Sequence, residues 1–463
     1  MAEKGKAIRR AFREFLTIPI AVIAAFLLLA VGSYVVERAD EGWIQDLRRL
    51  IQSVAFESPE ATSGLLGEIA GGLITVTSIT FSLLLLAVSQ TASSYTGVVF
   101  DQFLRWMLNQ LFFGYFIGLA LYALVVLATV RPEFNPVFGA SLALALMVVA
   151  LLLLILLIYD TIDQMRPDVI VDRIHDHTLV SRRRELAVVR RTRRQPHRVD
   201  IAGSTVKARE DGFVTDVDLD TLVTALREVG GEAEVELRVV LGSYVAFGDP
   251  LAEVRAPGTG GAALAEAVHR AIELDRIRAL ERDPAYGIEQ LTSIGWTSIS
   301  TARQNQAAGR LAILALRDLL GRWSRPDAEG EGAVQPAAVV AVVYRDDVPA
   351  GIVGALESLA VVATESMQHQ SFAEVLRAFA ATFGDLAPDD RRRVEDAIAR
   401  LLSGMGDLVL TADLVAALAA LTEALDRARS VETLAAVRRA EERLARSLGE
   451  LNSRATRVPA GAS

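Results

Sequence analysis

Long apolar runs occur only in the first 160 residues of the chain. Four of them reach the length of about 20 residues that an α-helix needs to cross the hydrocarbon core of a bilayer. A short turn, residues 131–136, joins the last two runs, so these two are expected to form an antiparallel hairpin. We therefore expect residues 1–160 to form a transmembrane domain, with spans at about residues 15–36, 69–90, 111–130 and 137–159.

The second predicted span is polar on one side. Read at helical spacing, its small and polar residues fall along one stripe, whereas Leu66, Leu73 and Leu84 lie opposite. Small residues in such a stripe allow neighbouring helices to pack closely. The stripe could instead line a pore in a homo-oligomer, with a ring of carboxylates near its outer end that favours cations. The candidate pore-lining residues are Glu68, Gly71, Thr75, Ser78, Ser82 and Ser89.

Beyond residue 160 the pattern of apolar positions changes. Residues 161–198 predict an amphipathic, Arg-rich juxtamembrane segment. Residues 199–256 contain short alternating runs punctuated by glycines, a pattern typical of strands and turns. They predict a small β-sandwich-like domain, with one inserted helix at about residues 219–228.

Helical spacing returns at residue 262. Residues 262–450 predict a mainly helical domain, with one buried strand at about residues 338–344. The last residues, 451–463, are expected to be a disordered tail. The expected fold class is thus an α-helical membrane protein with four transmembrane helices, followed by a small β-sandwich-like domain and a mostly α-helical cytoplasmic domain.

The distribution of charge sets the expected orientation of the spans. The N-terminal tail is basic, the first loop, residues 37–63, is predominantly acidic, and residues 166–198 contain ten Arg. Cytoplasmic loops of membrane proteins carry the excess of Lys and Arg. Both the N-terminus and the C-terminus are therefore expected to lie in the cytoplasm.

An arginine cluster follows the fourth predicted span. It either contacts anionic lipid headgroups, at about 1 kcal/mol for each charge near the surface, or only fixes the topology. The chain as a whole has a net charge of −9, so nucleic acid is not expected as a partner. The candidate headgroup contacts are Arg182, Arg183, Arg184, Arg190, Arg191, Arg193 and Arg194.

Candidate chemistry is scarce. The chain has no cysteine, which excludes disulfides, zinc–thiolate sites, iron–sulfur clusters and thiol nucleophiles. His175 and His177 could ligate a metal, but two positions apart on a helix they point to different faces. Motifs for phosphate-binding loops, dinucleotide binding and serine or zinc hydrolysis are absent. We expect no catalytic residue, no metal and no cofactor, and no enzyme activity.

Four short stretches carry a resemblance. They are Phe81-Ser82 in the second span, residues 211–220 (DGFVTDVDLD), residues 242–254 (GSYVAFGDPLAEV) and residues 283–291 (DPAYGIEQL). Together they resemble an uncharacterised family of predicted bacterial inner-membrane proteins, a domain of unknown function, over roughly residues 10–430. The resemblance implies four N-terminal spans, a cytoplasmic domain and a location in the bacterial inner (plasma) membrane. It implies no activity.

The chain departs from the family pattern at residues 300–306. The family pattern at this place looks like a turn of the form Ser-Pro-x-x-Asn-Asp-Pro. This sequence reads STARQNQ there, so the acid and the two prolines are all absent. A function tied to that turn is therefore not expected here.

Two hypotheses remain. The polar stripe, together with the lack of a catalytic set, favours a homo-oligomeric ion channel or pore with a cytoplasmic vestibule. The size and helical character of residues 262–448 favour instead a membrane-anchored scaffold or signalling protein whose cytoplasmic domain binds a protein partner.

Overall fold

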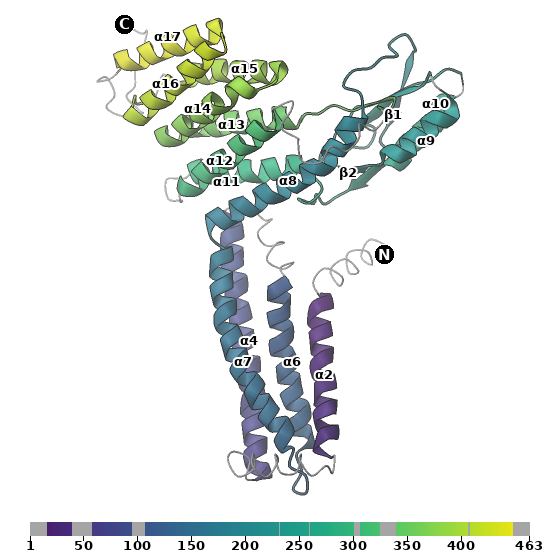
Figure 1. Ribbon diagram of the computed structural model, residues 1–463, viewed down its shortest axis with the longest axis vertical. Coiled ribbons are helices and arrows are strands. Elements are labelled where there is room, and N and C mark those ends of the chain that lie inside the picture. The colour runs from purple at the N-terminus through teal and green to yellow at the C-terminus, as the bar shows by residue number, and fades with distance from the viewer. Residues whose placement is uncertain are drawn as a thin grey trace. The chain divides into compact units, whose positions relative to one another are not determined.

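The structure is a computed structural model, and Figure 1 shows the chain. It describes residues 16–38, 58–94, 107–230, 232–258, 260–300, 306–324, 339–405 and 408–447. The chain divides into two compact units, Met1–Val169 and Ile170–Ser463. Within the described residues it is mostly helical, with several candidate membrane spans near the N-terminus and a small mixed sheet region. The predicted tail, residues 451–463, lies outside the described residues.

Four long helices form the N-terminal unit, in the part of it that the structure describes. Each is long and apolar enough to cross a membrane, by length and composition alone. The second predicted span, residues 69–90, lies inside a helix that begins ten residues earlier and is 36 residues long. The helices are α2 (Thr17–Glu37), α4 (Pro59–Ser94), α6 (Met107–Thr129) and α7 (Val137–Gln164).

Helix α6 is the centre of this unit, because it packs against α2, α4 and α7. A side chain at Gly118 would overlap the ring of Phe26 on α2, so glycine permits the close approach of these two helices. The hydroxyl of Tyr122 donates a hydrogen bond of 3.1 Å to the carbonyl of Gly139 and thereby joins α6 to α7. Aromatic and aliphatic side chains fill the space between the helices.

Glu37 joins the end of α2 to the start of α7. Its carboxylate is buried and accepts hydrogen bonds from the backbone N–H groups of Val137, at 3.0 Å, and Phe138, at 2.9 Å. The first N–H groups of a helix have no partner inside the helix, and a negative charge there is favourable. Glu37 was expected in the first loop, but it is the last residue of α2, where it caps α7 and joins the two helices.

The C-terminal unit begins inside α8 (Pro167–Arg191), at Ile170, and two small sheets follow this helix. One sheet has the order β1-β5-β3-β7 and the other β4-β2-β6; β3 and β7 are parallel, and the other pairs are antiparallel. The strands are β1 (Gly203–Lys207), β2 (Gly212–Val217), β3 (Glu234–Leu237), β4 (Tyr244–Val245), β5 (Pro250–Arg255), β6 (Ile272–Asp275) and β7 (Val342–Val343).

Two helices complete the core of the sheet region: α9 (Leu219–Val229) and α10 (Gly260–Ala271). Helix α9 matches the helix expected at about residues 219–228, and it begins where Asp218 caps the N–H groups of Asp220 and Thr221. The core continues past residue 256, where the sequence pattern ends the β-domain, because α10, β6 and β7 contribute to it. The sandwich-like stacking of the two sheets stays a prediction.

Helices fill the rest of the C-terminal unit. Each packs against its neighbours in the stack, for instance α11 against α12 and α13, and α14 against α16. They are α11 (Pro284–Ser300), α12 (Gln306–Trp323), α13 (Val348–Glu365), α14 (His369–Thr382), α15 (Pro388–Gly404), α16 (Ala412–Arg427) and α17 (Val431–Ser447).

Helix α13 is a fifth helix that is long and apolar enough to cross a membrane, by length and composition. It packs against α11, α12, α14 and α15. Most of its apolar side chains, including Ile352, Leu356 and Leu359, are buried against these neighbours. A helix that is covered on several sides is apolar on several sides, so burial accounts for its composition without a membrane.

Candidate functional site

The predicted polar stripe of α4 lies on the outer face of the N-terminal unit. All six candidate residues are exposed, while the opposite face of the helix is buried through Leu66, Leu73, Leu84 and Val88. An added Cβ at Gly71 would meet no heavy atom of the described chain within 4 Å. Among the described residues of one copy, then, the small residues of the stripe do not serve to pack α4 against another helix.

Two hydroxyls of the stripe bond to their own helix. Thr75 donates to the carbonyl of Gly71 at 2.8 Å, and Ser82 donates to that of Ser78 at 2.9 Å. Their protons are thus satisfied, and their oxygen atoms remain on the exposed face with lone pairs that can accept from water or contact a cation. Exposed aliphatic side chains, such as Ile74 and Leu86, border the stripe.

The seven arginines of the cluster after α7 differ in burial and in their partners. Arg182 is a correction to the sequence-based prediction, because it is only 1% exposed and cannot contact a lipid headgroup from there. Its guanidinium forms ion pairs of 2.6 Å with both Glu185 and Asp346 and lies 5.5 Å from the ring of Trp323. The burial of Arg182 could not be predicted from the sequence, because its partner Asp346 is 164 residues away along the chain.

The other arginines of the cluster differ in exposure. Arg191 pairs with Asp220 at 2.6 Å, and Arg193 pairs with Glu234 at 3.2 Å, so both are half-buried in contacts of the C-terminal unit. Four are exposed and keep the prediction of a headgroup contact: Arg183, Arg184, Arg190 and Arg194.

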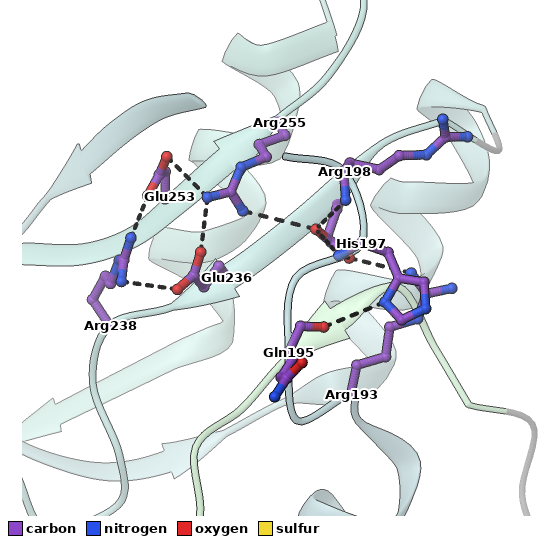
Figure 2. A network of polar contacts seen from close by, with 9 residues as sticks. Arg193, Gln195, His197, Arg198, Glu236, Arg238, Glu253 and Arg255 are labelled. Carbon is purple, nitrogen blue, oxygen red and sulfur yellow. Dashed lines mark hydrogen bonds and ion pairs between the residues drawn. The ribbon is translucent and has the colours of Figure 1, made fainter. Parts of the chain in front are cut away.

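Arg193 belongs to a polar network around strands β3 and β5 (Figure 2). Glu234 is fully buried there and accepts from the backbone N–H groups of His197 and Arg198 at 3.0 and 3.1 Å. Burial alone would raise the pKa of Glu234, but these N–H groups and the Arg193 guanidinium outweigh it and hold the pKa below its usual range.

A second part of the network lies beside Glu234. Arg255 lies 2.8 Å from Glu236 and 3.0 Å from Glu253, and Arg238 pairs with the same two acids. These ion pairs join side chains of neighbouring strands, so the network links β3 to β5.

Three of the four stretches that carry the family resemblance converge in the C-terminal unit, around Arg278. The guanidinium of Arg278 lies 5.4 Å from the ring of Phe213 and 4.7 Å from that of Tyr286, and it pairs with Asp283 at 2.6 Å. Gly242 has a φ of +83°, and a Cβ there would lie 2.6 Å from the Asp283 carboxylate. Residues from 211–220, 242–254 and 283–291 thus form one packed cluster.

The DPAYGIEQL stretch has a structural explanation of its own. Asp283 accepts from the N–H of Tyr286 at 2.9 Å and so caps α11, and Pro284 occupies the first turn, where it does least harm. A side chain at Gly287 would overlap Thr178 of α8, so glycine lets α8 and α11 approach. Leu291 is fully buried.

Residues 12–359 match the family model described as Predicted membrane protein (DUF2254). The chain belongs to this family. The resemblance seen in the sequence is thereby confirmed, although the match ends inside α13 at residue 359 and not near 430. No curated protein and no solved structure matches the chain.

The departure from the family pattern lies within this match, at the end of α11. Ser300 is the last residue of that helix, and residues 301–305 lie outside the described residues. The role of the altered turn therefore stays a prediction.

A groove of about 560 Å³ opens in the C-terminal unit of this family member. We call it the α11–α13 groove, because one wall is α11, from Ala285 to Trp296, and the other is the first half of α13. Val240 and Leu241 close it on the side of the sheets, and Glu185 of α8 contributes a buried carboxylate. Its size is within the range of about 300–1,000 Å³ that is usual for small-molecule sites.

Glu185 links the groove to the buried arginine. It pairs with Arg182 at 2.6 Å and accepts a hydrogen bond of 3.0 Å from the hydroxyl of Tyr344. Burial raises the pKa of the Glu185 carboxyl, although the Arg182 charge acts in the opposite direction. The sequence analysis missed this site; its only trace is the spacing of Gly351, Gly354 and Ser358 on one face of α13.

The two histidines considered as metal ligands, His175 and His177, lie on different faces of α8. The ring of His175 contacts Asp318 at 2.8 Å, and His177 lies on another face of α8. In the part of the chain that the structure describes, no group of three or more His, Cys, Asp or Glu side chains is placed to hold a metal ion.

Proposed function

We propose that the protein is an ion channel of the bacterial inner membrane, formed by several copies of the chain with α4 around a central pore. Helices α2, α4, α6 and α7 would be its four spans, and α13 would remain in the cytoplasmic domain, since its neighbours in the stack already cover it. The basic segments at the N-terminus and after α7 support an orientation with both termini in the cytoplasm.

The observation that carries this proposal is the exposure of all six stripe residues of α4. Lipid tails offer no hydrogen-bond partner, and a carboxylate such as Glu68 is costly at the edge of the hydrocarbon region unless it meets water or a partner. If several copies arrange α4 around an axis, the stripe faces an aqueous lumen while Leu66 and Leu73 stay packed in each copy.

The length of the stripe fits such a pore. From Glu68 to Ser89 a helix rises by about 32 Å, close to the thickness of about 30 Å of the hydrocarbon core. Glu68 would form a ring of carboxylates at the outer mouth, and the oxygens of Thr75, Ser78 and Ser82 would line the lumen below it. Rings of carboxylates and hydroxyl oxygens favour cations.

Single-channel recording of the purified protein in a planar bilayer tests this function. We expect cation-selective conductance in the wild type and a large loss of current in Ser82→Leu, which narrows the lumen. Glu68→Gln should keep the pore open and reduce the preference for cations. Leu83→Ile, on the lipid-facing side of the same turn, is the matched control. Silent bilayers together with a monomeric detergent particle would rule out the channel.

A second function, a membrane-anchored scaffold or signalling protein, draws support from the α11–α13 groove in the C-terminal unit. It predicts that a partner protein copurifies in fixed ratio with the full-length chain and that no conductance is seen. Purification of the full-length chain that yields no partner at a fixed ratio would count against it.

We further propose that Arg183, Arg184, Arg190 and Arg194 contact anionic lipid headgroups. All four are exposed, and they follow the last proposed span by 19 to 30 residues. Lipids that copurify with the wild type should be richer in anionic species than those with a variant in which all four are changed to Gln. An unchanged lipid composition would leave these arginines with a role in topology alone.

A further inference from the structure

We propose that the α11–α13 groove binds a small amphipathic cation, with an apolar body between the two helices and a positive charge beside the carboxylates of the groove. The site lies entirely in the C-terminal unit. The inference does not depend on the proposed channel, because it is drawn from different residues and a different measurement.

The floor of the groove is apolar. Leu241, Ile288 and Val348 are buried and line it from the sheet region, from α11 and from α13. Trp296 stands at the rim and is 51% exposed, which leaves its ring face available to a bound molecule. Such a combination of apolar walls and an aromatic rim is typical of sites for small organic ligands.

The wall formed by α13 is hollowed by its small residues. At Gly351 and Gly354 an added Cβ would meet no described heavy atom within 4 Å, and both residues are exposed on the groove side together with Ser358. Glycine inside a helix disfavours the helix. No close packing in the described chain requires glycine here, so the open space itself is what these positions provide.

The charge of the groove selects the sign of the ligand. Three carboxylates line it, those of Glu185, Glu289 and Asp347, and none of its described lining residues is Arg, Lys or His. The carboxylate of Glu289 pairs with Arg278, which also pairs with Asp283. Behind Glu185, the guanidinium of Arg182 is shared with a further carboxylate, that of Asp346. Acidic side chains therefore outnumber basic ones around the groove. The electric field of this excess negative charge acts more strongly at the edge of an apolar surface than in water.

The occupant is therefore an apolar molecule with a cationic group, not an anion or a neutral lipid tail. The carboxylates attract the positive charge of the ligand, and the apolar floor contacts its apolar body. The ring of Trp296 can stack on a cationic group at the rim. An acidic ligand would be repelled by the excess of negative charge around the groove.

Binding of two probes of equal size and opposite charge tests this directly. Tetraphenylphosphonium and tetraphenylborate are titrated into the full-length protein in nanodiscs, with empty nanodiscs as the reference for partition into lipid. We expect saturable binding of the cation at one site per chain and at least tenfold weaker binding of the anion. Equal binding of both, or no saturable binding above the empty discs, would overturn the proposal.

A variant that fills the groove identifies the site. Gly354→Leu places a side chain in open space and favours the helix, so the thermal midpoint should stay or rise while cation binding weakens at least tenfold. Val361→Leu, on the same helix and outside the groove, is the matched control and should bind as the wild type does. If Gly354→Leu binds normally, the cation binds elsewhere and the proposal is wrong.

A second variant isolates the charge. Glu289→Gln with Asp347→Asn keeps the shape of two exposed side chains and removes two negative charges. Tetraphenylphosphonium should bind several-fold more weakly to it, and the difference between cation and anion should shrink. An unchanged preference for the cation would contradict the role of these carboxylates.

Discussion

Glu234 shows how single charged residues stabilise the sheet region. It is fully buried, and its carboxylate accepts from two backbone N–H groups and one guanidinium. A buried acid without such partners would be strongly destabilising. Because its pKa is lowered, the folded chain holds this proton less tightly than the unfolded chain does.

We predict that Glu234→Gln lowers the free energy of unfolding of the C-terminal unit by about 2–4 kcal/mol at pH 7. The stabilisation by Glu234 is present above the pKa of an unfolded Glu, about 4.3, and is lost as the pH falls through the lowered folded value. Urea unfolding followed by tryptophan fluorescence should therefore show the two proteins converging below about pH 4. Exposed Glu232→Gln serves as the control and should change little.

Gly287 is constrained in a different way, by the distance between α8 and α11. We predict that Gly287→Ala costs about 1–3 kcal/mol, because the new methyl group overlaps Thr178. The double variant Gly287→Ala with Thr178→Ala should recover part of this loss. A double-mutant cycle in urea measures the coupling, and strictly additive effects would show that the contact is not the cause.

At the scale of elements, periodicity alone predicted much of the fold. Apolar runs predicted the helices α2, α4, α6 and α7, and α9 lies where an inserted helix was expected, at about residues 219–228. Periodicity shows which face of a helix is apolar, but not which partner covers it. For this reason α13 has the composition of a span although other helices of the C-terminal unit cover it.

The same limit applies to the predicted sites. The stripe of α4 could be read from the sequence because its six residues share one helix. The burial of Arg182 could not, since it depends on Asp346 and on Trp323, which fold back from far along the chain. The α11–α13 groove likewise needs four separate segments to come together.

The two glycines of α13 give a prediction at this scale. Gly351→Ala and Gly354→Ala should each raise the stability of the C-terminal unit by about 0.5–1 kcal/mol, because alanine favours the helix and meets open space. Thermal unfolding in detergent measures the effect. A lower midpoint would mean that these positions are packed against something in the assembled protein.

For the whole molecule, the membrane topology is the first question. We predict that the turn between α6 and α7 lies outside the cell and the segment after α8 inside it. A membrane-impermeant maleimide applied to intact cells should label Glu133→Cys but not Gln195→Cys, and both once the membrane is opened. The reverse pattern would invert the orientation and place Glu68 at the cytoplasmic end of α4.

The central claim is that the stripe of α4 faces water inside the membrane. The native chain has no cysteine, so single cysteines can be placed without interference. A charged, membrane-impermeant methanethiosulfonate reagent should modify Thr75→Cys, Ser78→Cys and Ser82→Cys in the membrane-embedded protein. It should spare Leu83→Cys, which is exposed and which the account places against lipid, and Leu84→Cys, which is buried in the unit. If the three stripe positions are as unreactive as Leu83→Cys, the stripe faces lipid or a dry helix contact and the channel account is wrong.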